Sequence, residues 1–245
     1  KAGPLLGAVF GSVPQCGFSV LAAAMYTRGM ITVGTLLSVF LATSDEAVPV
    51  ILAQPNKAGL VLPLLLTKVV IGVLAGYAVD FVLRSYGRPA GGELPTDDVI
   101  EETGCCEHSI SRQDTRRQLV IHPLVHTAKV FAFVFLVSLA LNYIIYRIGP
   151  HNLGKVFLQH SLLQPVIAAF VGLIPNCAAS VAITQVFLKG GISFGSAIAG
   201  LSASGGLGIL VLVKENHNTK DTLRVLGLLL GISIAVGIVV QYTVG

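Results

Sequence analysis

The chain has 245 residues, of which 53% are hydrophobic and 11% are charged. Soluble domains carry about 25% charged residues, so this composition excludes an ordinary soluble protein and indicates a membrane protein. In that setting the formal net charge of +4 does not indicate nucleic-acid binding, because Lys and Arg are typical of loops that flank membrane segments.

Apolar runs of about 20 residues, the length that crosses a bilayer core of about 30 Å, recur along the chain. They predict membrane segments over 4–26, 30–53, 58–84, 122–148, 157–188, 191–213 and 222–244. We expect an all-α membrane protein, organised as a first membrane repeat (1–84), a polar cytoplasmic linker (85–121) and a second membrane repeat (122–245). The abrupt apolar start at Lys1 suggests that a further helix precedes it.

The two membrane regions repeat each other. An offset of 161 residues aligns 14–53 with 175–214 without a gap. An odd number of crossings separates equivalent points, so the second repeat should be inverted, as in many secondary transporters. Identical pairs are Pro14 and Pro175, Cys16 and Cys177, Ser19 and Ser180, Gly29 and Gly190, Gly34 and Gly195.

Each repeat carries a Pro-amide-Cys motif inside an apolar run, namely Gln15-Cys16 in the first and Asn176-Cys177 in the second. Proline interrupts a helix, so these residues should begin new half-helices within broken or re-entrant segments. Polar backbone at membrane depth is tolerated where it is buried in protein or lines a wet cavity. A helix N-terminus favours the thiolate that binds metals. The alternative is that the cysteines are small buried apolar residues beside packing kinks.

A second break falls at LATSDEAVP (41–49), whose repeat partner is LSASGGLGI (201–209). Asp45 and Glu46 are charges within an apolar run, and such charges mark ion or substrate paths. Ser44 and Ser204 add hydroxyl groups that can coordinate a cation. The alternative is that the helix ends near Thr43 and that the acids lie in an exposed loop.

Lys68 lies in the middle of an apolar run. We expect it to form an ion pair with Asp45 or Glu46, because an unpaired buried Lys tends to lose its proton. The alternative role is to help bind an anion.

Two further clusters lie outside the breaks. His122, His126 and Lys129 share one helical face and indicate an interfacial anchor, with a metal entry site or a proton relay as alternatives. The linker group Cys105, Cys106, Glu107 and His108 has a soft-metal composition, although adjacent cysteines offer poor ligand geometry.

The motifs VPQCG, ATSDEAVP, HPLVHTAK and IPNCAAS resemble those of a bacterial family of ten-helix heavy-metal exporters. Its members are labelled arsenic efflux protein or manganese transporter. The resemblance covers most of the chain and is weakest in the linker. It implies ten helices arranged as five plus five and a location in the bacterial inner membrane.

Together these patterns predict a gradient-driven transporter that exports Mn²⁺, another divalent or soft metal, or arsenite by alternating access. The predicted metal ligands are Cys16, Asp45, Glu46 and Cys177. An oxyanion transporter that uses helix N-termini and Lys68, or a metal-sensing scaffold, stays open. We expect no enzymatic activity and no cofactor; the expected partners are the bilayer and a small inorganic ion, with homo-oligomer formation left open.

Overall fold

The computed structural model describes residues 2–44, 46–85, 136, 139, 143, 163–216 and 218–244. These residues are helical apart from short connections, and no β-strand occurs among them. The elements are α1 (Gly3–Gly11), α2 (Cys16–Thr27), α3 (Val33–Ala42), α4 (Ala47–Leu52), the 3₁₀ helix η1 (Pro55–Leu60), α5 (Val61–Ser85), α8 (Gln164–Gly172), α9 (Cys177–Leu188), α10 (Phe194–Ala203), α11 (Leu207–Glu215) and α12 (Thr219–Val244).

Four stretches within the described residues are long and apolar enough to cross a membrane. They are Val33–Leu52, Pro55–Ser85, Phe194–Glu215 and Thr219–Thr243. The first and the third each contain two helices with a break between them, α3 with α4 and α10 with α11. The expected multi-span helical membrane protein is therefore confirmed, whereas the predicted segment 122–148 lies almost entirely outside the described residues.

The helix bounds recur along the chain. The first and last residues of α1, α2 and α3 return 161 positions later as those of α8, α9 and α10. The last two helices of each set, α4 with α5 and α11 with α12, follow in the same order. Local signals account for part of this recurrence, because Pro14, Cys16 and Gly29 recur as Pro175, Cys177 and Gly190.

Both α2 and α9 end in the same way. Gly29 and Gly190 have φ of 69° and 74°, a left-handed conformation that favours glycine. Around each, two backbone N–H groups donate back to the last turn, Gly29 to Tyr26 and Met30 to Met25 in the first case. This is a Schellman motif, and it turns the chain sharply toward α3 and α10.

Glycines also set the packing of the long helices. A Cβ on Gly34 would lie 2.2 Å from the carbonyl oxygen of Gly76, and one on Gly195 would lie 2.5 Å from that of Gly237. Helix α3 therefore lies directly on α5, and α10 lies directly on α12. Small residues at such crossings allow close approach of helices in membranes.

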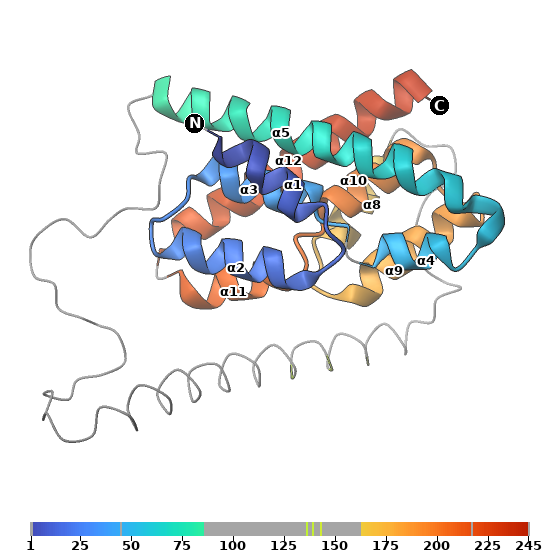
Figure 1. Ribbon diagram of the computed structural model, residues 1–245, viewed down its shortest axis with the longest axis horizontal. Helices are drawn as coiled ribbons and strands as arrows, with labels where there is room; N and C mark the ends of the chain where they lie inside the picture. Colours follow the sequence, from blue (N-terminus) through green and yellow to red (C-terminus); the bar gives the residue numbers. More distant parts are fainter. Residues whose placement is uncertain are drawn as a thin grey trace, which may run out of the picture.

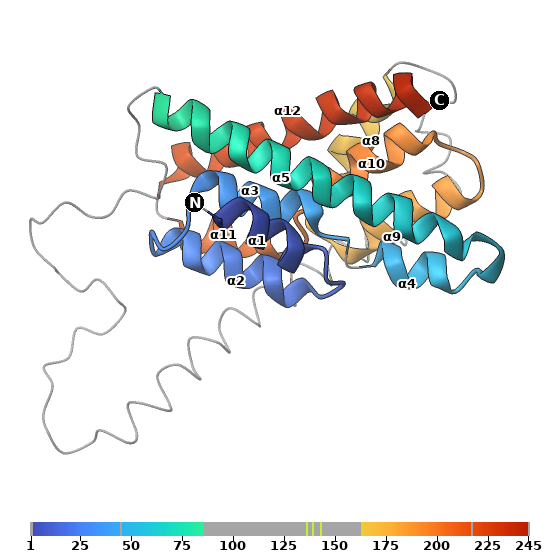
Figure 2. The same ribbon diagram turned by 45° about the horizontal axis from the view of Figure 1, so that its top comes forward.

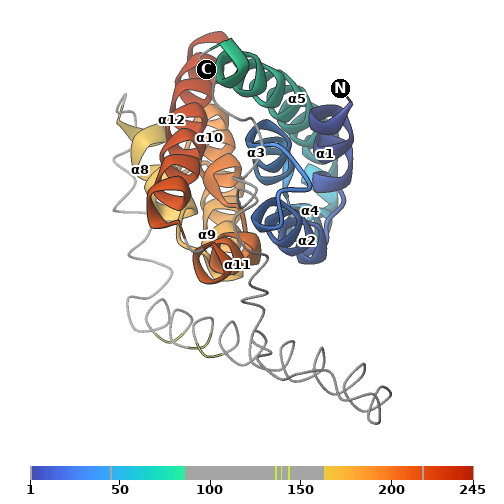
Figure 3. The same cartoon turned by 90° about the vertical axis from the view of Figure 1, so that its left-hand side faces the viewer.

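The halves are joined through their shorter helices. Helix α2 packs against α11, and α4 packs against α9 (Figure 1). One buried apolar cluster combines Phe40 of α3 with Leu212 of α11, and another combines Ile51 of α4 with Ile183 of α9. Figure 3 shows the two halves side by side, with the α2–α11 contact between them.

The two long helices run in opposite directions. In Figure 2, α5 ends on the left and α12 ends on the right, beside the C-terminus. The end of α5 lies near the start of α12, since Leu83 and Arg224 line one apolar groove. The basic residues at these two ends, Arg84 and Arg224 among them, therefore lie at the same end of the bundle.

Candidate metal centre

Two helical hairpins bring their tips close to each other beside Glu46. In the first, α1 ends at Gly11 and α2 begins at Cys16; in the second, α8 ends at Gly172 and α9 begins at Cys177. The residue before each cysteine has an extended backbone conformation. Each thiol is therefore carried on the first residue of a helix.

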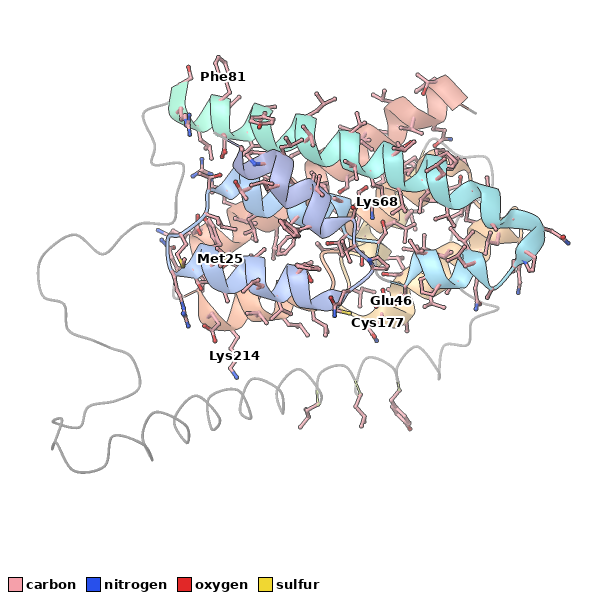
Figure 4. All side chains as sticks on the ribbon, viewed as in Figure 1. Met25, Glu46, Lys68, Phe81, Cys177 and Lys214 are labelled. Carbon is pink, nitrogen blue, oxygen red and sulfur yellow. The ribbon has the colours of Figure 1, made fainter. Side chains whose placement is uncertain are left out.

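The two thiols and one carboxylate lie together. The ligand atoms of Cys16, Glu46 and Cys177 all lie within 4.8 Å of one another, and the three residues are half-buried. The Sγ of Cys16 lies 3.9 Å from Oε1 of Glu46, to which it donates. Figure 4 shows Glu46 and Cys177 side by side, with Lys68 above them in this view.

Glu46 reaches this position because α3 and α4 are interrupted. Helix α3 ends at Ala42, and α4 resumes at Ala47. Thr43 and Ser44 in the gap are buried, which argues against an exposed loop at this point. Glu46 precedes α4 directly, and α4 packs on α9, which carries Cys177.

A small cavity of about 10 Å³ adjoins the carboxylate. This is close to the smallest volume that holds one water. Its walls are rich in oxygen, and the hydroxyls of Ser180 and Ser204 lie 2.9 Å apart. The lining residues are Thr43, Ser44, Glu46, Ala47, Ser180, Leu201 and Ser204.

Lys68 is fully buried on α5. Its ammonium donates to the carbonyl oxygen of Thr43 and, at 2.8 Å, to that of Leu201. These carbonyls belong to the two different breaks. The expected ion pair with Asp45 or Glu46 stays a prediction, because Asp45 lies outside the described part of the chain.

The two amides differ in their surroundings. Asn176 is buried, and its side chain accepts a hydrogen bond of 3.2 Å from the N–H of Ala178. Gln15 is exposed and makes no side-chain cap on α2. The repeat pairs these residues, but only Asn176 fixes a helix start.

Several predicted residues lie outside the described residues. Besides Asp45 they are His122, His126, Lys129 and the linker group Cys105, Cys106, Glu107 and His108. Their predicted roles stay predictions.

Asp80 was missed at the level of sequence. Its carboxylate accepts from the N–H of Gly34 at 2.9 Å and from the hydroxyl of Thr32 at 2.7 Å. It therefore caps the start of α3. In the second half Gln164 contacts the start of α10, accepting from the N–H of the N-cap residue Ser193 at 3.1 Å and from the hydroxyl of Ser196 at 3.0 Å. The single acid inside the apolar run 58–84 was the available signal.

These three ligand atoms form a group that could hold a metal ion. Thiolates select soft ions, imidazole and mixed sets suit zinc, and carboxylates suit harder ions. A tetrahedral ion held by two sulfurs and one carboxylate oxygen would have one position left for water or another ligand, unlike a closed structural site with four protein ligands. The thiols must lose their protons to bind.

The helices and this thiol–carboxylate cluster define a multi-span helical membrane protein with a candidate ion site at the break points. The chain belongs to the family described as "Putative, 10TM heavy-metal exporter", whose profile matches residues 1–145 and 115–244. The resemblance found in the sequence motifs is thereby confirmed, and an exporter is not an enzymatic class. No curated protein and no solved structure matches the chain.

Proposed function

We propose that the protein carries a divalent or soft metal ion out across the bacterial inner membrane by alternating access around Cys16, Glu46 and Cys177. The observation that carries the proposal is the convergence of these three ligand atoms within 4.8 Å. They come from three separate helix starts, those of α2, α4 and α9. A family of heavy-metal exporters supplies the class of cargo.

The donor set favours a soft or borderline ion. Two thiols and a carboxylate suit Zn²⁺ or Cd²⁺ better than Mn²⁺, which prefers oxygen ligands. Arsenite is neutral at pH 7 and would be held by thiol exchange at Cys16 and Cys177, without a need for an acidic ligand. We therefore rank zinc-like ions first, arsenite second and manganese third.

An inverted repeat supplies the means of alternation. The helix bounds recur with one offset of 161 residues, and α5 and α12 run in opposite directions. We infer that α1–α2 and α8–α9 are re-entrant hairpins that enter from opposite sides. Substrate sites of such transporters lie near the bilayer midplane between the repeats. The chain carries no Walker A motif in its sequence, so an ion gradient is the proposed energy source.

The oxyanion alternative requires a cation directed at the centre. Lys68 is a fully buried candidate, but its ammonium donates to the carbonyls of Thr43 and Leu201. That arrangement favours a structural cation over an anion receptor. Phosphate remains in the test as the probe for this alternative.

The test is uptake into inside-out proteoliposomes, with Zn²⁺, Cd²⁺, Mn²⁺, arsenite and phosphate compared. The wild type should carry Zn²⁺ or Cd²⁺ fastest, and the double variant Cys16→Ser/Cys177→Ser should lose this activity. The matched control is Cys105→Ser/Cys106→Ser, which replaces the two linker thiols and should retain it. Phosphate uptake without metal uptake, or full metal uptake by the Cys16/Cys177 variant, would contradict the proposal.

A further inference from the structure

Lys68 joins the two helix breaks through backbone oxygen atoms. The residue is fully buried, and its ammonium donates to carbonyls of Thr43 in the first half and Leu201 in the second. No other described Lys is buried in this way; Lys57, which also donates to a helix carbonyl, that of Leu188, lies in η1 at the outer end of α5. Lys68 thus provides a fixed positive charge between the halves.

The acceptor carbonyls lie at the ends of interrupted helices. Thr43 is the C-cap of α3, and Leu201 lies in the last turn of α10. The last four carbonyls of a helix have no partner within it, and the helix dipole gives that end a partial negative charge. In membrane transporters the carbonyls at such ends coordinate Na⁺ or protons. An ammonium in this position occupies a place suited to a monovalent cation.

The surroundings supply further oxygen ligands. Thr43 and Leu201 also line the small cavity beside Glu46, together with hydroxyl residues Ser44, Ser180 and Ser204. If the ammonium were removed, the carbonyl oxygens of Thr43 and Leu201 would lose this donor, next to a cavity that the hydroxyl residues line. Oxygen ligands of this kind suit a hard cation.

The charge is present in one half only. The residue that corresponds to Lys68 at the offset of 161 is Leu229, which is fully buried. One ammonium therefore serves both breaks, and the second half contributes a carbonyl without a second charge.

We propose that the ammonium of Lys68 substitutes for a bound sodium ion, as a covalently attached cation that links the two breaks. The protein then needs no Na⁺ to stabilise the contact between the two helix breaks, and metal transport is independent of Na⁺. The transport part of this inference rests on the proposed function, whereas the binding part does not.

The experiment compares the wild type with Lys68→Ala in matched NaCl and choline chloride. Melting temperature in detergent and metal uptake in proteoliposomes are both measured. The wild type should respond equally to the two salts. Lys68→Ala should melt lower in choline and recover with increasing Na⁺, and its uptake should be at least about tenfold faster in Na⁺, a difference of about 1.4 kcal/mol.

Lys57→Ala is the matched control. It removes an ammonium that donates to the carbonyl of Leu188 at the end of α9, and it should show no preference for Na⁺ over choline. A wild type that requires Na⁺, or a Lys68→Ala variant with no Na⁺ response, overturns the proposal. A variant that is unfolded in both salts counts as no response. The melting measurement needs no transported metal, so it separates this proposal from failure of the proposed function.

Discussion

The hydroxyl of Tyr26 donates a hydrogen bond of 2.7 Å to Oδ2 of Asp221, which lies 195 residues away. This bond connects the end of α2 in the first half to the start of α12 in the second. At the corresponding place in the other half, Lys57 of η1 donates to the carbonyl of Leu188 at the end of α9. Each hairpin is thereby held, at the end far from its tip, by the opposite half.

Replacing Tyr26 with Phe should destabilise the protein by about 1.5–3 kcal/mol, because a hydrogen bond to a charged group is lost. The loosened end of α2 should also let a membrane-impermeant maleimide reach Cys16 faster. Thermal melting, and labelling rates in the Cys105→Ser/Cys106→Ser/Cys177→Ser background, provide the measurements. Tyr242→Phe makes the same change at an exposed position and should alter neither the melting temperature nor the labelling rate. If Tyr26→Phe also left both unchanged, the hydrogen bond to Asp221 would not stabilise the protein.

Glu46→Gln should weaken Zn²⁺ or Cd²⁺ binding. The amide keeps the size of the side chain and removes its charge, and loss of outer-shell partners alone costs about 10–100-fold in metal affinity. We expect a loss of about 100-fold or more, measured by calorimetric titration of the purified protein. Glu215→Gln, at the end of α11, is the control and should bind as the wild type does. Wild-type affinity in Glu46→Gln would remove the carboxylate from the site.

Metal binding should release protons. Thiols must be deprotonated to coordinate a metal, so affinity should fall as the pH is lowered. Calorimetry in two buffers of different ionisation enthalpy gives the number of protons released per metal. That number should drop in Cys16→Ser and in Cys177→Ser; equal proton release in all three proteins would argue against thiol ligation.

Gly34→Ala should destabilise the first half by about 1–3 kcal/mol, the usual cost of overpacking. The added Cβ would lie 2.2 Å from the carbonyl oxygen of Gly76 and 2.5 Å from the carboxylate of Asp80. Gly231→Ala is the matched control, because nothing lies within 4 Å of a Cβ built there. The difference in melting temperature between the two variants provides the measurement, and equal values would contradict the close approach of α3 and α5.

The helical membrane class could be predicted from the sequence because bilayer thickness imposes long apolar runs. The helix starts at Cys16 and Cys177 were also accessible, since proline and capping act locally. The bond between Tyr26 and Asp221 was not accessible, because it depends on how α2 docks on the other half. The acceptors of Lys68 could not be predicted either: every residue carries a carbonyl, so the sequence shows only the cation.

The role of Asp80 was not predicted from the sequence for a different reason. It stands in an apolar run as conspicuously as Lys68 does, but its partners are the backbone of Gly34 and the hydroxyl of Thr32. Intramembrane charge was interpreted as a mark of ion chemistry, whereas this carboxylate completes a helix start. The roles of Cys16, Glu46 and Cys177 in metal binding stay a prediction.

The most direct test is to cross-link the two hairpin tips. In the Cys105→Ser/Cys106→Ser background, with a protease site inserted within residues 85–121, Cys16 and Cys177 are the two remaining thiols of the chain. After mild oxidation and cleavage, the two halves should stay joined on a non-reducing gel and separate with reductant, and bound Cd²⁺ should slow the reaction. A Cys16→Ser control should give halves that separate without reductant. The same result in the two-thiol protein would show that the thiols do not meet and that there is no shared metal centre.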